Sequence, residues 1–207
     1  MVVDFNKKLD IMIPNARCEL NYSRDYELVI ATVLSAQCTD KRVNEVTKVL
    51  FSNYDIYGLA SASKKDIEKI IRSCGSFTKK ADYIVEIAKS LISNYNGVVP
   101  NDREYLEGLP GVGRKTANVV LSNLFDVPAI AVDTHVERVS KRLKIARKSD
   151  SVLMVEKKLM KMIPMDLWSR SHHQLVLFGR YICKARGPLC EKCAFYDDCK
   201  SKDKKKI

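Results

Sequence analysis

Apolar residues recur at helical spacing along almost the whole chain. In the segments that begin at Leu28 and at Ile84, for example, apolar side chains return every three or four residues. Because such positions share one face of an α-helix, the spacing predicts amphipathic helices. Glycine and proline residues divide the pattern into about ten short helices. The pair Asn96-Gly97 is followed only by Val-Val-Pro, which is too short for the second strand of a hairpin. The sequence therefore predicts an all-α fold.

The chain is basic, with 36 lysines and arginines against 25 aspartates and glutamates in 207 residues, a formal net charge of +11. A positive excess favours a polyanionic partner, because each phosphate that lysine or arginine neutralises releases counterions. A solvated surface with a lysine-rich end, SKDKKKI, explains the charge equally well. Charge alone leaves both interpretations open.

A membrane segment is not expected in this sequence. Its longest apolar stretches, such as LVIATVLSA after Glu27, fall short of the ~20 residues that cross a bilayer. The first residues, MVVDFNKKLDIMIPN, carry charges inside their apolar segment and lack a small-residue cleavage site, so a secretory signal is not expected either. With 46% hydrophobic residues, the chain can build a core, and its length allows one large or two small domains. We expect a cytoplasmic protein.

A short loop with two glycines, Leu109-Pro110-Gly111-Val112-Gly113, precedes a helix expected over residues 114–125. Glycines permit close backbone approach, and the N–H groups that open a helix suit a phosphate oxygen. A nucleotide-binding P-loop has the pattern G-x-x-x-x-G-K-[ST]. Here Arg114 stands between Gly113 and Lys115, and no strand is expected before the loop. An ATPase or GTPase is therefore disfavoured.

Four of the seven cysteines lie close together near the end of the chain, in the pattern C-x6-C-x2-C-x5-C: Cys183, Cys190, Cys193 and Cys199. Four thiolates at this spacing can surround one metal centre, and their chemistry alone leaves zinc and iron–sulfur both open. The scattered Cys18, Cys38 and Cys74 have apolar neighbours, where cysteine acts as a small buried hydrophobe. We assign them no chemistry.

Three separated motifs then occur in a fixed order, followed by the four cysteines. LSAQCTD covers residues 34–40, LPGVGRKTANVVL covers 109–121, and AVDTHVERV covers 131–139. In this combination, from about Tyr26 to Cys199, the chain resembles the endonuclease III family, DNA glycosylases of the helix-hairpin-helix superfamily. The resemblance implies two helical lobes with a DNA-binding cleft: a continuous domain, residues 21–128, with the hairpin, and a discontinuous one, residues 1–20 plus 129–207, with the cysteine loop.

The resemblance also implies an activity. The expected reaction is bifunctional: an oxidised pyrimidine is excised from double-stranded DNA, and the abasic site is then cleaved on its 3′ side by β-elimination. Lys115 matches the nucleophile, whose neutral amine forms a Schiff base with the opened sugar. Asp133 matches the family carboxylate, which either stabilises positive charge on the sugar or takes a proton from the amine. Asp133 also precedes an expected helix, so it is equally a candidate N-cap. The expected enzyme is a monomer at the bacterial nucleoid.

Further residues match DNA contacts of the family. Gln37 corresponds to the side chain that fills the space left by the rotated base, and His135 faces phosphate. The spacing of the four cysteines is the one that this family uses for a [4Fe-4S] cluster, whose loop would hold Lys184 and Arg186 ready for phosphate. The hairpin would contribute four more DNA-binding residues: Leu109, Gly111, Gly113 and Arg114.

The chain departs from the family pattern at Ser76. Bacterial members carry a leucine after the glycine here, which wedges between bases, whereas Gly75 is followed by Ser76 and Phe77. A serine is a poor wedge. Two alternatives remain open: Phe77 supplies the apolar insertion, or Gln37 carries more of the work.

Two other functions compete with this one. An adenine-specific mismatch glycosylase of the same superfamily shares the cluster, but it lacks a lysine at position 115 and usually has an additional C-terminal domain. A non-catalytic DNA-binding module would use the hairpin and the cluster only to hold phosphates. Lys115 favours the bifunctional enzyme over both.

Overall fold

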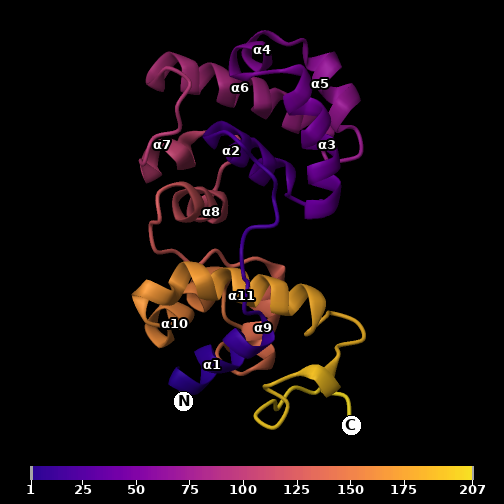
Figure 1. Ribbon diagram of the computed structural model, residues 1–207, viewed down its shortest axis with the longest axis vertical. Helices are drawn as coiled ribbons and strands as arrows, with labels where there is room; N and C mark the ends of the chain where they lie inside the picture. Colours follow the sequence, from indigo (N-terminus) through magenta and orange to yellow (C-terminus); the bar gives the residue numbers. More distant parts are fainter. Residues whose placement is uncertain (1, 207) are drawn as a thin grey trace. The chain divides into compact units, whose positions relative to one another are not determined.

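The computed structural model describes residues 2–206. In this part of the chain the secondary structure consists of eleven α-helices and two short 3₁₀ helices, without a strand (Figure 1). The all-α prediction is thus confirmed. The chain divides into two compact units: one continuous, Glu19–Phe125, and one discontinuous, which joins the residues up to Cys18 with those from Asp126 onward.

The continuous unit is built around one buried helix. Every residue from Tyr26 to Leu34 of α2 is buried, and α2 packs against α3, α6 and α8. The long helix α6 packs against α4 and α5. The helices of this unit are α2 (Asp25–Leu34), α3 (Asp40–Asn53), α4 (Ile56–Ser61), α5 (Lys64–Ile71), α6 (Phe77–Tyr95), α7 (Arg103–Gly108) and α8 (Arg114–Leu124).

Short polar side chains begin most of these helices. A side-chain oxygen at the N-cap accepts a hydrogen bond from a backbone N–H that has no partner within the helix, which stabilises the first turn. The capping side chains of α3, α4, α5 and α7 are those of Thr39, Asp55, Ser63 and Asp102.

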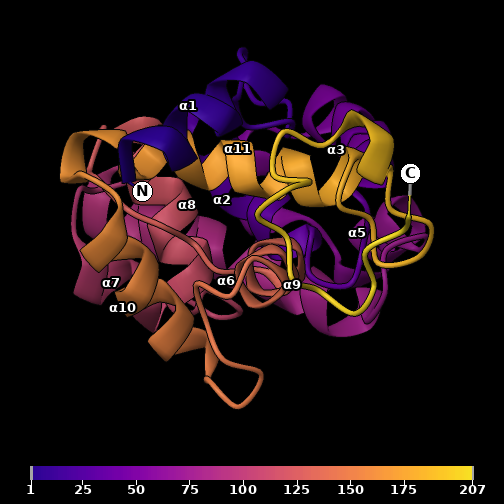
Figure 2. The same cartoon turned by 90° about the horizontal axis from the view of Figure 1, so that it is seen from below.

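The discontinuous unit surrounds α11. This helix packs against α1 on one side and α9 on another, and α1 runs alongside it in both views (Figures 1 and 2). The Phe178 ring of α11 lies 5.5 Å from the ring of Phe195, which lies 5.4 Å from that of Phe5. The core therefore joins both ends of the chain. The helices are α1 (Val2–Met12), α9 (Thr134–Arg142), α10 (Val152–Met162), η1 (Met165–Leu167), α11 (Trp168–Tyr181) and η2 (Cys190–Lys192).

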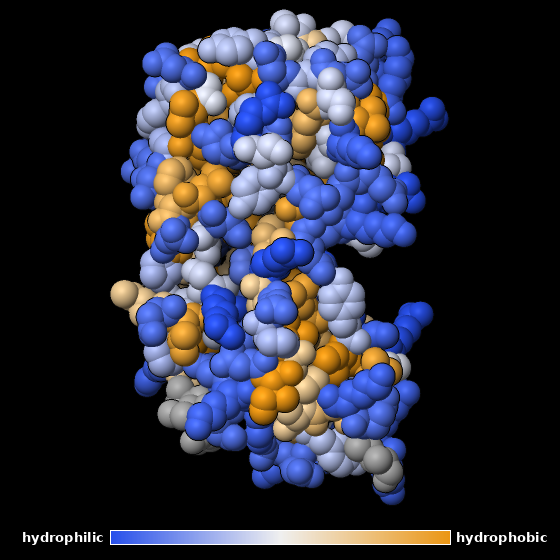
Figure 3. All heavy atoms as spheres, in the orientation of Figure 1, coloured by the Kyte–Doolittle hydropathy of each residue, from blue (hydrophilic) through white to orange (hydrophobic). Residues whose placement is uncertain are grey.

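On the face drawn in Figure 3, hydrophilic residues are interspersed with smaller apolar patches. Within residues 2–206, none of the helices has the length and apolar character to cross a membrane.

Candidate functional site

A tight turn connects α7 to α8. The Val112 N–H donates to the Leu109 carbonyl oxygen at 3.1 Å, and both side chains are buried, so they anchor the turn within the continuous unit. Gly111 has φ +77°, and a Cβ there would lie 2.6 Å from Cδ2 of Tyr83. Only glycine fits this position, for both conformational and steric reasons. Because Leu109 is buried, only its main chain is available to a partner at this turn.

Gly113, the N-cap of α8, has no such internal requirement. Its backbone is extended, with φ −102° and ψ −178°, and a Cβ would meet nothing within 4 Å. The residue is exposed, as are Arg114 and Lys115 after it. An absent side chain here leaves the N-terminal end of α8 accessible to a group outside the chain. The backbone N–H groups and the positive end of the helix macrodipole at that point favour an anion.

Lys115 is the second residue of α8 and extends from the same exposed turn. Within residues 2–206 its ammonium has no carboxylate partner at salt-bridge distance, in contrast to Lys64, Lys69 and Lys141. The side chain therefore remains available for a substrate.

Asp133 is the N-cap of α9. Its Oδ1 accepts hydrogen bonds from the backbone N–H groups of His135, at 2.9 Å, and Val136, at 2.8 Å. The capping interpretation of this residue is confirmed. Both bonds end on Oδ1, and Oδ2 accepts none from the described residues, so the same carboxylate retains one oxygen for another partner. Lys115 belongs to the continuous unit and Asp133 to the discontinuous unit.

His135 is positioned by Arg138, one turn further along α9. The Arg138 Nη2 lies 3.1 Å from Nδ1 of His135. A guanidinium can only donate, so Nδ1 must accept and the ring proton of a neutral His135 is on Nε2. Nε2–H is a donor, which suits the phosphate contact expected for this residue.

Two exposed turns of the continuous unit carry Gln37 and Ser76. Both residues have φ 57°, in the left-handed region that residues other than glycine rarely adopt. Such strained positions are frequent at functional sites. A Cβ on Gly75 would lie 3.5 Å from the Gln37 carbonyl oxygen, so the turns are packed together. Phe77, the first residue of α6, is half-buried.

The four C-terminal cysteines line one pocket of the discontinuous unit, together with Phe178 and Arg142. Their sulfurs influence one another: burial raises the pKa of the Cys193 thiol to about 11, and Cys183, Cys199 and Cys190 add to the rise. Within residues 2–206, no three His, Cys, Asp or Glu side chains are gathered tightly enough to hold a single ion. The donor set is all thiol, and soft ligands of this kind select zinc, copper(I) or iron–sulfur centres.

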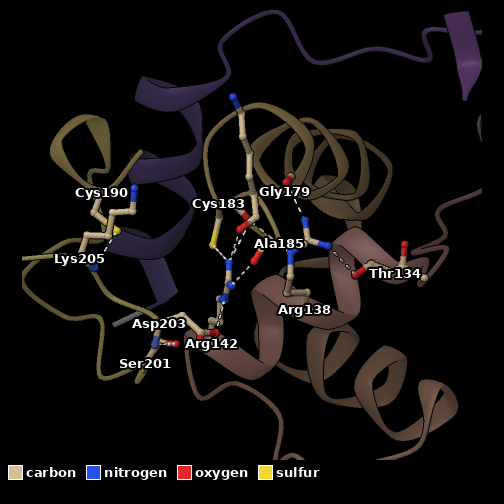
Figure 4. A network of polar contacts seen from close by, with 11 residues as sticks. Thr134, Arg138, Arg142, Gly179, Cys183, Ala185, Cys190, Ser201, Asp203 and Lys205 are labelled. Atoms are coloured by element: carbon tan, nitrogen blue, oxygen red, sulfur yellow. Dashed lines mark hydrogen bonds and ion pairs between the residues drawn. The ribbon is translucent and has the colours of Figure 1, made fainter. Parts of the chain in front are cut away.

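Arg142, at the end of α9, holds the loop that follows Cys183 (Figure 4). Its Nη1 donates to the carbonyl oxygens of Cys183, at 3.2 Å, and Lys184, at 2.6 Å, and lies 3.5 Å from the Cys183 Sγ. Nη2 donates to the Ala185 carbonyl oxygen at 3.2 Å, and Nε pairs with Asp203 at 2.9 Å. One guanidinium thus fixes the backbone from which the exposed side chains of Lys184 and Arg186 extend.

A basic pocket of about 280 Å³ lies beside this loop. Its lining supplies six cationic side chains and only one carboxylate, and such a site favours an anion. The lining residues are Arg138, Lys141, Arg142, Lys144, Lys148, Ser201, Lys202 and Asp203.

Comparison with known proteins places the chain in a family. The model of the HhH-GPD superfamily of base excision DNA repair proteins matches residues 30–165. Endonuclease III of Bacillus subtilis (strain 168) is 51% identical over 199 residues, which are 96% of this chain and 91% of the relative. The chain belongs to the endonuclease III family.

Other comparisons agree with this family. Endonuclease III of Escherichia coli (strain K12) is 42% identical over 205 residues, 96% of this chain and 97% of the relative. A trapped covalent intermediate of an endonuclease III with DNA, an estranged-adenine complex, matches with a TM-score of 0.91 and 51% identity over 97% of this chain and 96% of that one. As an endonuclease III family member, the chain is a DNA glycosylase and AP lyase of base excision repair.

Two residues of the site in this endonuclease III family member, Arg138 and Arg142, were not predicted from the sequence. Arg138 donates through Nη2 to the Gly179 carbonyl oxygen at 2.7 Å and through Nε to that of Cys183 at 3.2 Å, so the two arginines bind carbonyl groups in the last turn of α11 and in the loop that follows it. Their four-residue spacing in THVERVSKR predicts one helical face. Nothing in that segment indicates that the face meets a loop more than 40 residues away.

Proposed function

We propose that the protein excises oxidised pyrimidines from double-stranded DNA through a Schiff base on Lys115 and then cleaves the abasic site on its 3′ side. The observation that carries this proposal is the position of Lys115. It is an amine without a carboxylate partner among the described residues, on the exposed first turn of α8. The turn begins at Gly113, where the absent side chain admits close approach of DNA.

The chemistry requires a nucleophile that keeps its bond to the sugar. The neutral Lys115 Nζ attacks C1′, the C1′–N bond to the base breaks, and the sugar opens to a protonated imine. That imine acidifies C2′; loss of a C2′ proton and breakage of the C3′–O bond then complete the β-elimination. The proposed role of Asp133 in this step is to supply a negative charge. It either stabilises positive charge on the sugar or takes a proton from the attacking amine.

The DNA contacts follow the exposed surfaces of each unit. In the continuous unit, Gln37 fills the space of the rotated base, and Ser76 and Phe77 meet the neighbouring stack. The hairpin holds phosphate through the main chain of Leu109, Gly111 and Gly113 and the side chain of Arg114. In the discontinuous unit, three side chains hold phosphate: His135 through Nε2–H, and Lys184 and Arg186 through their charges.

The pocket with Cys183, Cys190, Cys193 and Cys199 is proposed to hold a [4Fe-4S] cluster. Four thiols lining one pocket fit the donor set of such a cluster, and their protons are released when the metal binds. When bound, such a cluster would hold the loop rigid and would take no part in bond cleavage. The chain's own contribution is Arg142, which orients the loop backbone and so presents Lys184 and Arg186 to DNA.

The organisation of the molecule is part of this proposal. The continuous domain of residues 21–128 would carry the hairpin and Lys115, and the discontinuous domain of residues 1–20 plus 129–207 would carry Asp133 and the cluster. The enzyme would act as a monomer on the bacterial nucleoid in the cytoplasm.

Borohydride trapping tests the nucleophile. Reduction of the Schiff base should link the protein covalently to DNA with an abasic site or an oxidised pyrimidine, whereas Lys115→Ala should not be trapped. Lys65→Ala, at an exposed lysine of α5, is the matched control and should be trapped like the unchanged protein. Trapping that persists in Lys115→Ala would refute the assignment. DNA binding without any trapping of the unchanged protein would favour the non-catalytic module, and excision of mismatched adenine without trapping would favour the adenine glycosylase.

A further inference from the structure

Two cysteines of the continuous unit that are 36 residues apart in the sequence meet in the fold. Cys38 lies in the turn after α2, and Cys74 lies in the turn between α5 and α6. Their Sγ atoms are 3.6 Å apart. Cys38 directly follows Gln37 in the first of these turns, and Cys74 lies two residues before Ser76 in the second.

Packing around the pair holds the two turns together. The buried Lys80 of α6 donates from Nζ to the carbonyl oxygens of Leu34, at 2.9 Å, and Ala36, at 2.6 Å. These two hydrogen bonds connect the first turns of α6 to the end of α2 and to the segment that precedes Cys38. Gly75 lies beside the Gln37 carbonyl, where an added Cβ would be at an ordinary van der Waals distance of 3.5 Å. The proximity of the sulfurs is therefore a property of the packed unit.

The two thiols differ in access. Cys74 is 1% exposed, whereas Cys38 is partly exposed, so an oxidant from solvent reaches Cys38 first. Burial raises the pKa of the Cys74 thiol to about 12, and the positive charges of Lys80 and Arg42 act against that rise. Cys74 is thus a protected thiol beside the accessible one. Because the thiolate is the nucleophile, the raised pKa slows attack by Cys74, whereas its sulfur, only 3.6 Å from that of the accessible Cys38, is well placed for a resolving partner.

We propose that Cys38 and Cys74 are a site of reversible oxidation, where a peroxide forms a disulfide that joins the turns of Gln37 and Ser76. The Cys38 sulfur attacks one peroxide oxygen, the O–O bond breaks, and a sulfenic acid and water result. The Cys74 sulfur then displaces the hydroxyl group as a second water. Two S–H bonds are replaced by one S–S bond, and the peroxide takes both electrons and both hydrogens.

The functional effect rests on the proposed function, in which these turns contact lesion DNA. The Sγ–Sγ distance of 3.6 Å has to shorten to about 2.05 Å in a disulfide, so the adjoining backbone shifts. A misplacement of about 1 Å in groups that position a substrate can cost up to about a hundredfold in rate. Oxidation should therefore lower the single-turnover rate of lesion excision about tenfold or more, and a thiol reductant should restore it.

The experiment uses the anaerobically purified holoprotein. Diamide, a diazene that accepts two hydrogens and becomes a hydrazine, forms disulfides without exposing the protein to peroxide. Peptide mapping without reductant should find Cys38 linked to Cys74, about 2 Da lighter than the two free peptides. Cys38→Ser and Cys74→Ser should form no such link and should keep their excision rate in diamide, while Cys18→Ser, the matched control, should behave like the unchanged protein. Thermal unfolding of each variant confirms that it is folded.

Each possible result tests a different part of the proposal. If the map shows Cys38 and Cys74 as free thiols after treatment, the oxidation site is wrong. If the link forms but the excision rate is unchanged, the coupling to DNA engagement is wrong. If the link forms and the reduced protein excises nothing, the proposed function fails while the oxidation site stands.

Discussion

The carboxylate of Asp133 combines a structural and a chemical capacity in one side chain. Oδ1 accepts the N–H groups of His135 and Val136, which begins α9 and places His135 on its first turn. Oδ2 accepts no hydrogen bond from the described residues, and the residue is only partly buried. The two capacities can be separated by substitution, because asparagine is as good an N-cap as aspartate but carries no charge.

We predict that Asp133→Asn lowers the single-turnover excision rate by about a hundredfold or more, since its charge is lost at the reacting sugar. Asp133→Ala should lose the same activity and also about 1 kcal/mol of unfolding free energy, because the cap is lost. Denaturant unfolding and rapid-quench excision assays measure the two effects. An Asp133→Asn enzyme with unchanged rate would leave Asp133 with the cap alone.

The hairpin between α7 and α8 contains two glycines, and the physical reason for having a glycine differs between the two positions. Gly111 is required by the fold, because its φ is +77° and a Cβ would lie 2.6 Å from Tyr83. Gly113 is extended and unobstructed, so the fold alone would accept a side chain there. The proposed contact with a phosphate explains why it has none.

This difference gives a matched pair of variants. Gly111→Ala should lower the unfolding free energy by more than about 1 kcal/mol, because it adds both strain and a clash. Gly113→Ala should leave stability nearly unchanged but weaken binding to abasic-site DNA several-fold. Thermal unfolding and fluorescence anisotropy at one fixed salt concentration measure both properties. Equal DNA affinity of Gly113→Ala and the unchanged protein would contradict the assigned phosphate contact.

At the scale of the whole molecule, the discontinuous unit depends on both ends of the chain. The Ala194 N–H donates to Sδ of Met12, Lys8 of α1 pairs with Asp198, and the ring of Phe5 packs against that of Phe195. The loop with the four cysteines is therefore attached to the first helix as well as to α9 and α11. Because metal binding contributes to folding free energy and this loop contacts α1, α9 and α11, the proposed cluster should stabilise the entire unit.

We predict about four irons per chain in protein purified without air, with a brown colour. Removal of the iron should increase hydrogen exchange in α1 and α9 as well as in the loop, while α2 should keep its protection. Metal analysis and hydrogen-exchange mass spectrometry measure these outcomes. A colourless preparation with one zinc per chain would overturn the iron–sulfur assignment.

Local sequence determined the helices, the hairpin turn and the cap at Asp133, because these depend on hydrogen bonds and side-chain contacts a few residues apart. The resemblance of three motifs was enough to predict the family. The sequence predicted Leu109 as a DNA contact; the structure adds that its side chain is buried and anchors the turn, which leaves its main chain for that contact. Three contacts depend on the tertiary structure alone. Arg142 binds the loop after Cys183, Lys80 donates a hydrogen bond to the last carbonyl group of α2, and the sulfur of Cys38 lies beside that of Cys74. These contacts join segments 36 to 46 residues apart, and no local periodicity or spacing encodes which of them pack together.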